Sequence, residues 1–155
     1  MTIFIDTREK ARAIQKIIEA FDRHGVTHVS NKLYVGDYQR LDNPMVVVDR
    51  KQNLLEVAQN VCQDHKRFKA ELIRAKEAGI HIVFLVEHGR SVRSLEDVKA
   101  WVNPRLKTSP LAMSGERLYK ILTTMQQTYG CEFQFCTKAE TGDRILEILN
   151  ERRQI

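Results

Sequence analysis

The sequence predicts an α/β protein in which one mixed β-sheet is flanked by helices. Short apolar runs typical of strands alternate with longer segments whose apolar residues recur every three or four positions. The most hydrophobic run, IHIVFLVE at 80–87, predicts a strand in the middle of the sheet, because apolar residues occupy both of its faces. The chain has 155 residues, 43% of them hydrophobic, which fits one domain over 1–155 with a real core.

The individual elements follow this alternation along the chain. In the first third we expect a strand at 2–6, a helix at 9–23, one or two strands at 26–35, an extended segment at 36–41, a turn at 42–44 and a strand at 45–49. Apolar positions in steps of three and four then predict one long helix over 54–78, closed by Gly79. The remaining expectations are the strand at 80–87, a short helix at 94–101, a loop at 103–115, a helix at 116–129, a strand at 131–136 and a closing helix at 141–152.

The charge, the cysteines and the hydropathy narrow the class of protein. Lys and Arg outnumber Asp and Glu by 25 to 20, which is compatible with a polyanionic partner without proving one. The three cysteines are odd in number and lack the spacing of a metal site, which predicts free thiols in a reducing compartment. The start of the chain is too short and too acidic for a signal peptide, and no apolar run approaches the roughly 18 residues of a membrane helix. We therefore expect an intracellular protein without membrane contact.

Three charged residues, Asp49, Arg50 and Lys51, directly follow the valine run at 46–48. If 36–41 and 45–49 form a hairpin, Asp37 comes close to Asp49, and Lys51 points the same way as Asp49 while Arg50 points away. Two adjacent carboxylates repel each other, and a hydrated magnesium ion relieves that repulsion. A metal, a water and an ammonium group together suit phosphodiester hydrolysis. The alternative is a turn acid and a solvated strand end, and for this pair alone the two interpretations carry equal weight.

Two further motifs extend this pattern into an ordered set. IDTRE at 5–9 and LYVGDY at 33–38 precede VVVDRK at 46–51. In this order the motifs resemble the XPF/Hef-type structure-specific DNA endonuclease domain of the restriction-endonuclease-like PD-(D/E)xK nuclease superfamily. The resemblance continues through RFKAEL at 67–72, the run at 80–87 and the last strand and helix. It implies a restriction-endonuclease-like mixed β-sheet flanked by helices.

The resemblance also implies a function, that of a Mg²⁺- or Mn²⁺-dependent endodeoxyribonuclease acting on branched DNA such as flaps, forks or junctions. By motif, Asp37 and Asp49 look like the metal ligands, with the backbone carbonyl of Arg50 completing the set, and Lys51 looks like the catalytic lysine. Asp6 and Glu9 look like supporting acids of the catalytic set. The arginines expected to face DNA are Arg8, Arg67 and Arg50, and for Arg50 support of the active-site loop is the alternative.

The sequence departs from the family pattern at two positions. The family usually has glutamate where this chain has Asp49, whose carboxylate is one methylene shorter. The family also often has an acid four residues after the catalytic lysine, where this chain has Leu55, with Glu56 beside it. One outer contact of the site is therefore expected to be missing or shifted.

The resemblance leaves the partners and the catalytic status open. A non-catalytic DNA-binding or scaffold subunit is the alternative function, although such members usually lose the lysine or an acid. The chain shows no helix-hairpin-helix module, so a homodimer or a partner subunit is expected to assist substrate choice. The small form suggests the cytoplasm of a bacterial or phage-infected cell, with association to the nucleoid.

Several other polar residues favour ordinary structural roles. Glu71 and Arg74 lie on a helix face of the kind that is usually solvated, with i,i+4 pairs. His65 falls on the apolar stripe of the long helix, which predicts a core or edge position rather than a metal site. The loop at 103–115 carries Arg105 and could touch a DNA backbone, but a mobile surface loop is the simpler expectation.

Overall fold

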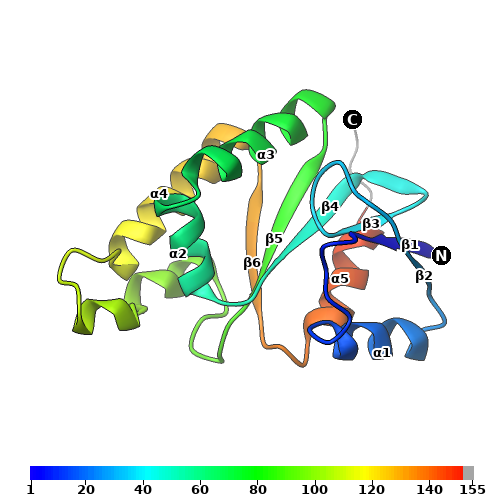
Figure 1. Ribbon diagram of the computed structural model, residues 1–155, viewed down its shortest axis with the longest axis horizontal. Helices are drawn as coiled ribbons and strands as arrows, with labels where there is room; N and C mark the ends of the chain where they lie inside the picture. The colour runs from blue at the N-terminus through cyan, green and yellow to red at the C-terminus, as the bar shows by residue number, and fades with distance from the viewer. Residues whose placement is uncertain (152–155) are drawn as a thin grey trace.

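The computed structural model describes residues 1–151 and contains a six-stranded mixed sheet in the order β2-β1-β3-β4-β5-β6 (Figure 1). The strands are β1 (Thr2–Ile5), β2 (Thr27–Ser30), β3 (Tyr38–Arg40), β4 (Asn43–Lys51), β5 (His81–Glu87) and β6 (Glu132–Cys136). The helices are α1 (Gln15–Arg23), α2 (Leu54–Cys62), α3 (His65–Ala78), α4 (Gly115–Tyr129) and α5 (Thr141–Asn150), with short 3₁₀ helices η1 (Leu95–Ala100) and η2 (Pro104–Lys107). The predicted fold class is confirmed.

The sheet combines two parallel parts through one antiparallel strand. Strands β4, β5 and β6 run parallel, as do β1 and β2, while β3 pairs antiparallel with both β1 and β4. Strand β5 lies inside the sheet between β4 and β6, as its sequence predicted. Because β4, β5 and β6 are parallel, their carboxyl ends meet at one edge of the sheet.

Each face of the sheet has its own hydrophobic cluster. Helices α2, α3 and α4 cover one face and α1 and α5 cover the other (Figure 1). Strand β4 serves both clusters, because Val47 packs toward α2 and α3 whereas Val46 and Val48 pack toward α1 and α5. This alternation continues past the valines, so Asp49 and Lys51 share the face of Val47 and Arg50 shares the face of Val48.

The prediction of one helix over 54–78 was wrong, because α2 ends at Cys62 and α3 begins at His65. Residues 62–67 are all exposed, so no buried side chain carries the apolar stripe across this segment until Phe68. His65 is exposed on the first turn of α3, and its expected core or edge position was also wrong. Because of the break, the axes of α2 and α3 point in different directions on the same face of the sheet (Figure 1).

The other differences lie near the first strand and in the turns. Helix α1 starts at Gln15 rather than at residue 9, because residues 7–13 form turns anchored by Glu9 N–H donating to the carbonyl of Asp6. Only 27–30 of the expected strand at 26–35 is extended in the sheet, and 31–36 loops back across the end of β1. The β3–β4 turn lies at 41–42 rather than 42–44, and the loop at 103–115 contains η2. The closing helix was expected to reach 152, which is outside the described residues.

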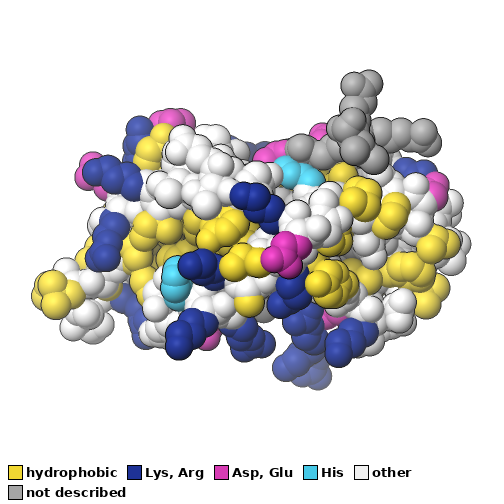
Figure 2. Space-filling view, turned by 90° about the horizontal axis from the view of Figure 1, so that it is seen from above, with side chains coloured by type: hydrophobic (Ala, Val, Ile, Leu, Met, Phe, Trp, Pro, Cys, Tyr) yellow, Lys and Arg dark blue, Asp and Glu magenta, His cyan; other side chains and the backbone are white. Residues whose placement is uncertain are grey.

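Two broader expectations concern membranes and disulfides. Among the helices of residues 1–151, none is both long and apolar enough to span a bilayer. Cys62, Cys131 and Cys136 are free thiols, and Cys131 and Cys136 are buried. Figure 2 shows that the face seen from above exposes hydrophobic side chains on the side of α3 and α4, interspersed with Lys and Arg.

Candidate active site

The site begins where the chain enters β3. Gly36 has a φ of 76°, and a Cβ at this position would lie 3.0 Å from Cγ2 of Val47, so only glycine fits without displacing β4. The next residue, Asp37, donates its backbone N–H to the carbonyl of Val48 at 2.8 Å and accepts the N–H of Asp6 on its own carbonyl at 2.8 Å. Its carboxylate oxygen Oδ2 accepts the N–H of Arg50 at 2.8 Å. Asp37 is thereby fixed between the ends of β1 and β4.

The β3–β4 register places Asp37 opposite Asp49, because Tyr38 pairs with Val48. Burial raises the pKa of Asp37 well above its ordinary value, and the negative charges of Asp49 and then Glu9 raise it further. The hydrogen bond from Arg50 and the charge of Lys51 offset only part of this effect. The two aspartates thus come together as the hairpin argument predicted, and their mutual repulsion favours a bound cation.

Lys51 lies beside the aspartates, and its side chain is almost completely buried. Its Nζ is 3.3 Å from Oδ1 of Asp49 and 5.3 Å from the centre of the Phe68 ring, and its side chain is 10% exposed. Burial lowers the pKa of Lys51, but the charge of Asp49, followed by those of Glu71, Glu56 and Asp37, raises it to a net value above the ordinary one. Lys51 therefore stays an ammonium group at neutral pH, suited to stabilise negative charge and unsuited to accept a proton.

Glu71 is a member of this cluster that the sequence interpretation missed. Burial raises the pKa of Glu71 to about 8, with further contributions from the charge of Asp49 and a hydrogen bond to it. Oxygen Oε1 of Glu71 is buried without a hydrogen-bond partner, as is Oδ1 of Asn60 on α2. The expectation of a solvated helix face was therefore wrong at Glu71. The available signal was its spacing of three from Phe68 within RFKAEL, which puts both on one side of α3.

Asp6 holds the loops around the site together and lies outside the lining of the pocket. Its carboxylate is completely buried and accepts the N–H of Leu33 at 2.8 Å, the N–H of Arg8 at 3.1 Å and Nε of Arg8 at 2.6 Å. Burial raises the pKa of Asp6, but the hydrogen bonds from Leu33 and Arg8 outweigh it and leave the pKa lowered. Asp6 therefore positions the 31–36 loop and Arg8.

Arg50 is engaged on the opposite face of β4. Its guanidinium pairs with both carboxylate oxygens of Glu9, at 2.8 and 2.9 Å, and with Glu87 at 2.5 Å. Glu87 also accepts the hydroxyl of Thr141 at 2.9 Å, which ties the pair to the start of α5. The Arg50 side chain is 6% exposed, so of the two expected roles this geometry favours support of the active-site loop over contact with DNA. Glu9 therefore holds the Arg50 guanidinium in place through two hydrogen bonds.

A pocket of about 300 Å³ opens over the cluster. Its mouth carries Arg8, whose side chain is 66% exposed, and Arg67 from the first turns of α3. Glu56 also lines the pocket and accepts the N–H of Gln52 at 2.7 Å, whereas Leu55 faces away into a different pocket. The acid that the family often has four residues after the lysine is thus replaced by Glu56, one residue further on, which faces the site. The residues in the lining are Arg8, Glu9, Asp37, Asp49, Arg50, Lys51, Gln52, Glu56, Asn60, Asp64, Arg67, Phe68 and Glu71.

The donor atoms of this pocket decide which cation it could hold. Within residues 1–151 there is no group of three or more His, Cys, Asp or Glu side chains arranged around a common metal position. The available donors are carboxylate oxygens of Asp37 and Asp49 and the unpartnered oxygens of Glu71 and Asn60. An all-oxygen set with few carboxylates fits Mg²⁺ or Mn²⁺, which keep several waters, better than Zn²⁺.

Comparison with known proteins agrees with this arrangement. The family model of the ERCC4 domain matches residues 5–148. Among solved structures, XPF from Aeropyrum pernix has a TM-score of 0.68 at 21% identity, covering 96% of this chain and 63% of that one. The same protein in complex with DNA has a TM-score of 0.67 at 20% identity, covering 96% and 62% of the two chains. The chain thus spans less than two thirds of the length of these structures, and no curated protein matches it in a sequence search. Since the family model covers nearly the whole described chain, we conclude that this protein belongs to the ERCC4 domain family and has the fold of the XPF nuclease domain.

Proposed function

We propose that this chain is a Mg²⁺- or Mn²⁺-dependent DNA endonuclease whose substrate is branched DNA, such as a flap, a fork or a junction. The observation that carries the proposal is the convergence of Asp37, Asp49 and the ammonium group of Lys51 in one pocket. Membership of the ERCC4 domain family and the DNA complex of the structurally similar XPF support it. The branched substrate, the metal and a homodimeric or partnered state are inferences from the family resemblance.

In this proposal each residue of the pocket has a separate task. Asp37 and Asp49 would hold the cation, and the free oxygens of Glu71 and Asn60 would accept hydrogen bonds from waters in the same pocket. When bound, the cation would neutralise the carboxylates and activate water for attack on phosphorus, to give 5′-phosphate and 3′-hydroxyl ends. Lys51 would donate to the negative charge that develops on the phosphate, and its raised pKa keeps it protonated for that task. Arg8 and Arg67 would orient the DNA backbone at the mouth of the pocket.

The test is a cleavage assay on labelled linear, flap, fork and four-way DNA with Mg²⁺, Mn²⁺ or EDTA. Wild type is expected to cut branched DNA with either metal and to cut nothing in EDTA. Asp37→Asn should abolish cleavage while DNA binding is kept or tightened, because one negative charge that repels phosphate is gone. Far-UV circular dichroism is the control for folding of the variant.

Three outcomes would contradict the proposal. A wild-type protein that binds branched DNA equally well in EDTA and never cuts it would be the scaffold subunit. Equal cleavage of all four substrates would indicate a nuclease that ignores DNA structure. An Asp37→Asn protein that fails to fold would assign Asp37 a structural role.

A further inference from the structure

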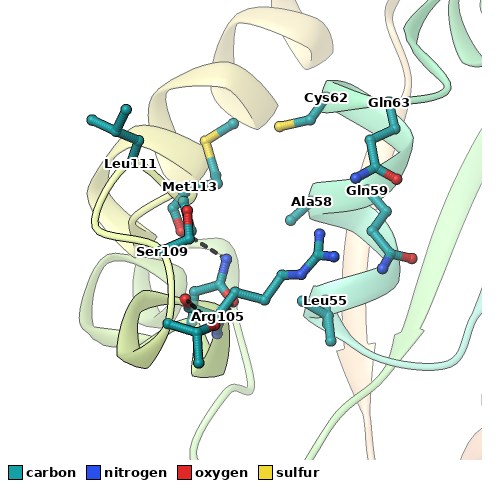
Figure 3. Close-up of a pocket in the computed structure, with 12 residues that line it drawn as sticks. Leu55, Ala58, Gln59, Cys62, Gln63, Arg105, Ser109, Leu111 and Met113 are labelled. Atoms are coloured by element: carbon teal, nitrogen blue, oxygen red, sulfur yellow. Dashed lines mark hydrogen bonds between the residues drawn. The ribbon is translucent and has the colours of Figure 1, made fainter.

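A second pocket lies on a neighbouring face of α2, away from the acidic cluster. It has a volume of about 420 Å³ and is formed between α2 and the 103–113 loop (Figure 3). The side of α2 that carries Glu56 and Asn60 lines the acidic pocket, while the side that carries Leu55 and Gln59 lines this one. Since an α-helix is about 10 Å across, a few nucleotides of one DNA strand could pass from one pocket to the other.

Arg105 is the one charged residue among those that line this second pocket. Figure 3 shows its side chain reaching from η2 across the pocket toward α2, with the guanidinium near Leu55, Ala58 and Gln59. Within the described chain no carboxylate pairs with this guanidinium, and no acidic side chain lines the pocket. A guanidinium without a partner in an acid-free pocket favours an anionic ligand, above all a phosphate that it can bind with two hydrogen bonds.

The loop that carries Arg105 is held in place by a buried side chain. Asn103 is 2% exposed, donates Nδ2–H to the carbonyl of Met113 at 3.0 Å and accepts the N–H of Arg105 on Oδ1 at 3.0 Å. The carbonyl of Arg105 in turn accepts the N–H of Ser109 at 2.8 Å. These bonds close the two ends of the loop on each other, so the guanidinium is presented by a preorganised frame.

The rest of the lining is chemically divided. Leu55 and Ala58 lie next to the guanidinium and Met113 lies across the pocket from α2 (Figure 3). Ala112 also lines the pocket, while Leu111 at its rim is 92% exposed. The amides and hydroxyls at its edge come from Gln59, Gln63, Thr108 and Ser109. Apolar walls suit the flat face of a nucleobase, and amide and hydroxyl groups suit its edges.

We propose that this pocket binds one unpaired nucleotide of the DNA substrate, with the phosphate on Arg105 and the base against the apolar walls. The inference rests on the proposed function, since it identifies part of the substrate of the same enzyme. A base paired within a duplex cannot enter a pocket of this size, so the site selects DNA that has unpaired nucleotides close to the bond to be cut. It gives a structural reason for a preference for branched over linear DNA.

The test compares binding of two DNAs in EDTA, where no cleavage occurs. One is a fluorescein-labelled single strand of about 15 nucleotides, and the other is a blunt duplex of the same sequence. Arg105→Ala should weaken binding of the single strand at least about tenfold, as expected for the loss of the charge-assisted hydrogen bonds to one phosphate, and leave duplex binding unchanged. The slope of log affinity against log salt for the single strand should fall by about 0.7, the value for one phosphate contact.

Two further variants make the test specific to the pocket. Lys107→Ala removes a cation from the same 3₁₀ helix outside the pocket lining, and it should leave the ratio of single-strand to duplex affinity unchanged. Ala112→Trp should fill the pocket and weaken single-strand binding without removing a charge. Thermal melting of each variant reports whether the fold is intact.

The outcomes separate this inference from the proposed function. Equal losses for Arg105→Ala and Lys107→Ala, equal losses on both DNAs, or no loss would overturn the inference, as would a wild type that does not bind the single strand. A wild type that cuts branched DNA without the predicted binding difference would keep the proposed function and reject the pocket. A wild type that never cuts DNA but shows the difference would keep the pocket and reject the nuclease.

Discussion

At the scale of single residues, the site shows that neighbouring acids in the sequence can have opposite tasks. Asp6 is fully buried and every contact of its carboxylate goes to the protein, whereas Asp37 keeps part of its carboxylate directed at the pocket. The pKa values record this difference, because hydrogen bonds lower that of Asp6 while burial and negative neighbours raise that of Asp37. A carboxylate whose oxygens all accept hydrogen bonds from the protein, such as that of Asp6, stabilises the surrounding loops. A carboxylate with a free oxygen, such as that of Asp37, is available to a ligand.

Glu71 gives a prediction that tests whether a buried carboxylate has been left without enough hydrogen-bond partners. Its pKa rises from 4.5 to about 8 in the fold, so folding must take up a proton, and wild-type stability falls as pH rises through that window. Glu71→Gln needs no proton and should raise the free energy of unfolding by about 3 kcal/mol at pH 7 without divalent metal, and by nothing at pH 4. Urea unfolding at the two pH values measures this.

Cleavage should fall in the same Glu71→Gln variant, because an amide oxygen accepts hydrogen bonds from water in the pocket more weakly than a carboxylate does. Lys69→Gln on the same helix is the control, because Lys69 is exposed and does not contribute to the raised pKa of Glu71, and it should show no such dependence on pH. A Glu71→Gln protein that is less stable at pH 7 than wild type would mean that the carboxylate is ionised and well paired in the fold.

Arg50 gives the converse prediction, for a charge that the fold has satisfied. Arg50→Met would leave Glu9 and Glu87 buried without their partner, and it should lower the free energy of unfolding by about 3 kcal/mol. DNA affinity of the folded variant should stay at the wild-type value, because the guanidinium does not reach the surface. The comparison is Arg67→Met, an exposed position at the pocket mouth, which should weaken DNA binding and leave stability unchanged. A selective loss of DNA binding in Arg50→Met would restore the predicted role in DNA contact.

At the scale of elements, the sequence predicted which side chains meet at the strand ends, but it did not predict where the helices pack. Alternation along the valine run placed Asp49 and Lys51 on one side, and the hairpin brought Asp37 to them, because both depend on local geometry. Glu71 joins them only because α3, which starts afresh after the break at 63–64, packs against β5 beside β4 and lines the same pocket. No periodicity within 54–78 encodes that break, so the polar face was taken for a solvated one.

The turn into β3 offers a prediction for one element. Gly36→Ala places a Cβ 3.0 Å from Val47 in a residue with positive φ, and it should destabilise the protein by about 2 kcal/mol. The cleavage rate should also fall under conditions in which the variant is still folded, because the strain displaces Asp37, the next residue. Gly89→Ala is the matched control, since a Cβ there meets nothing within 4 Å. Urea unfolding and the flap assay measure the two effects, and full activity in Gly36→Ala would show that the turn does not set the position of Asp37.

At the scale of the whole molecule, the site depends on both faces of one sheet. The acids and Lys51 lie on the face covered by α2 and α3, while Arg50, Glu87 and Thr141 brace the other face from α5. The alternation of helices and strands along the chain predicted the two-layered cover, since parallel strands β4, β5 and β6 need helices on both sides. Which helix covers which face depends on contacts between residues far apart in sequence, as between α1 and α5, and no local pattern records it.

Strand β4 should therefore couple the two clusters into one unfolding unit. Val47 and Val48 are both completely buried, on opposite faces, and truncation of either to alanine should cost about 2 kcal/mol. Trp101, the only tryptophan of the chain, packs against the cluster of Val47, so its fluorescence reports on that face alone. We expect Val48→Ala to lower the urea midpoint measured by Trp101 fluorescence as much as the midpoint measured by far-UV circular dichroism, because the sheet unfolds as a whole. If the fluorescence midpoint stayed at the wild-type value, the two faces would unfold separately, and the brace at Arg50 could fail without disturbing the acids across the strand.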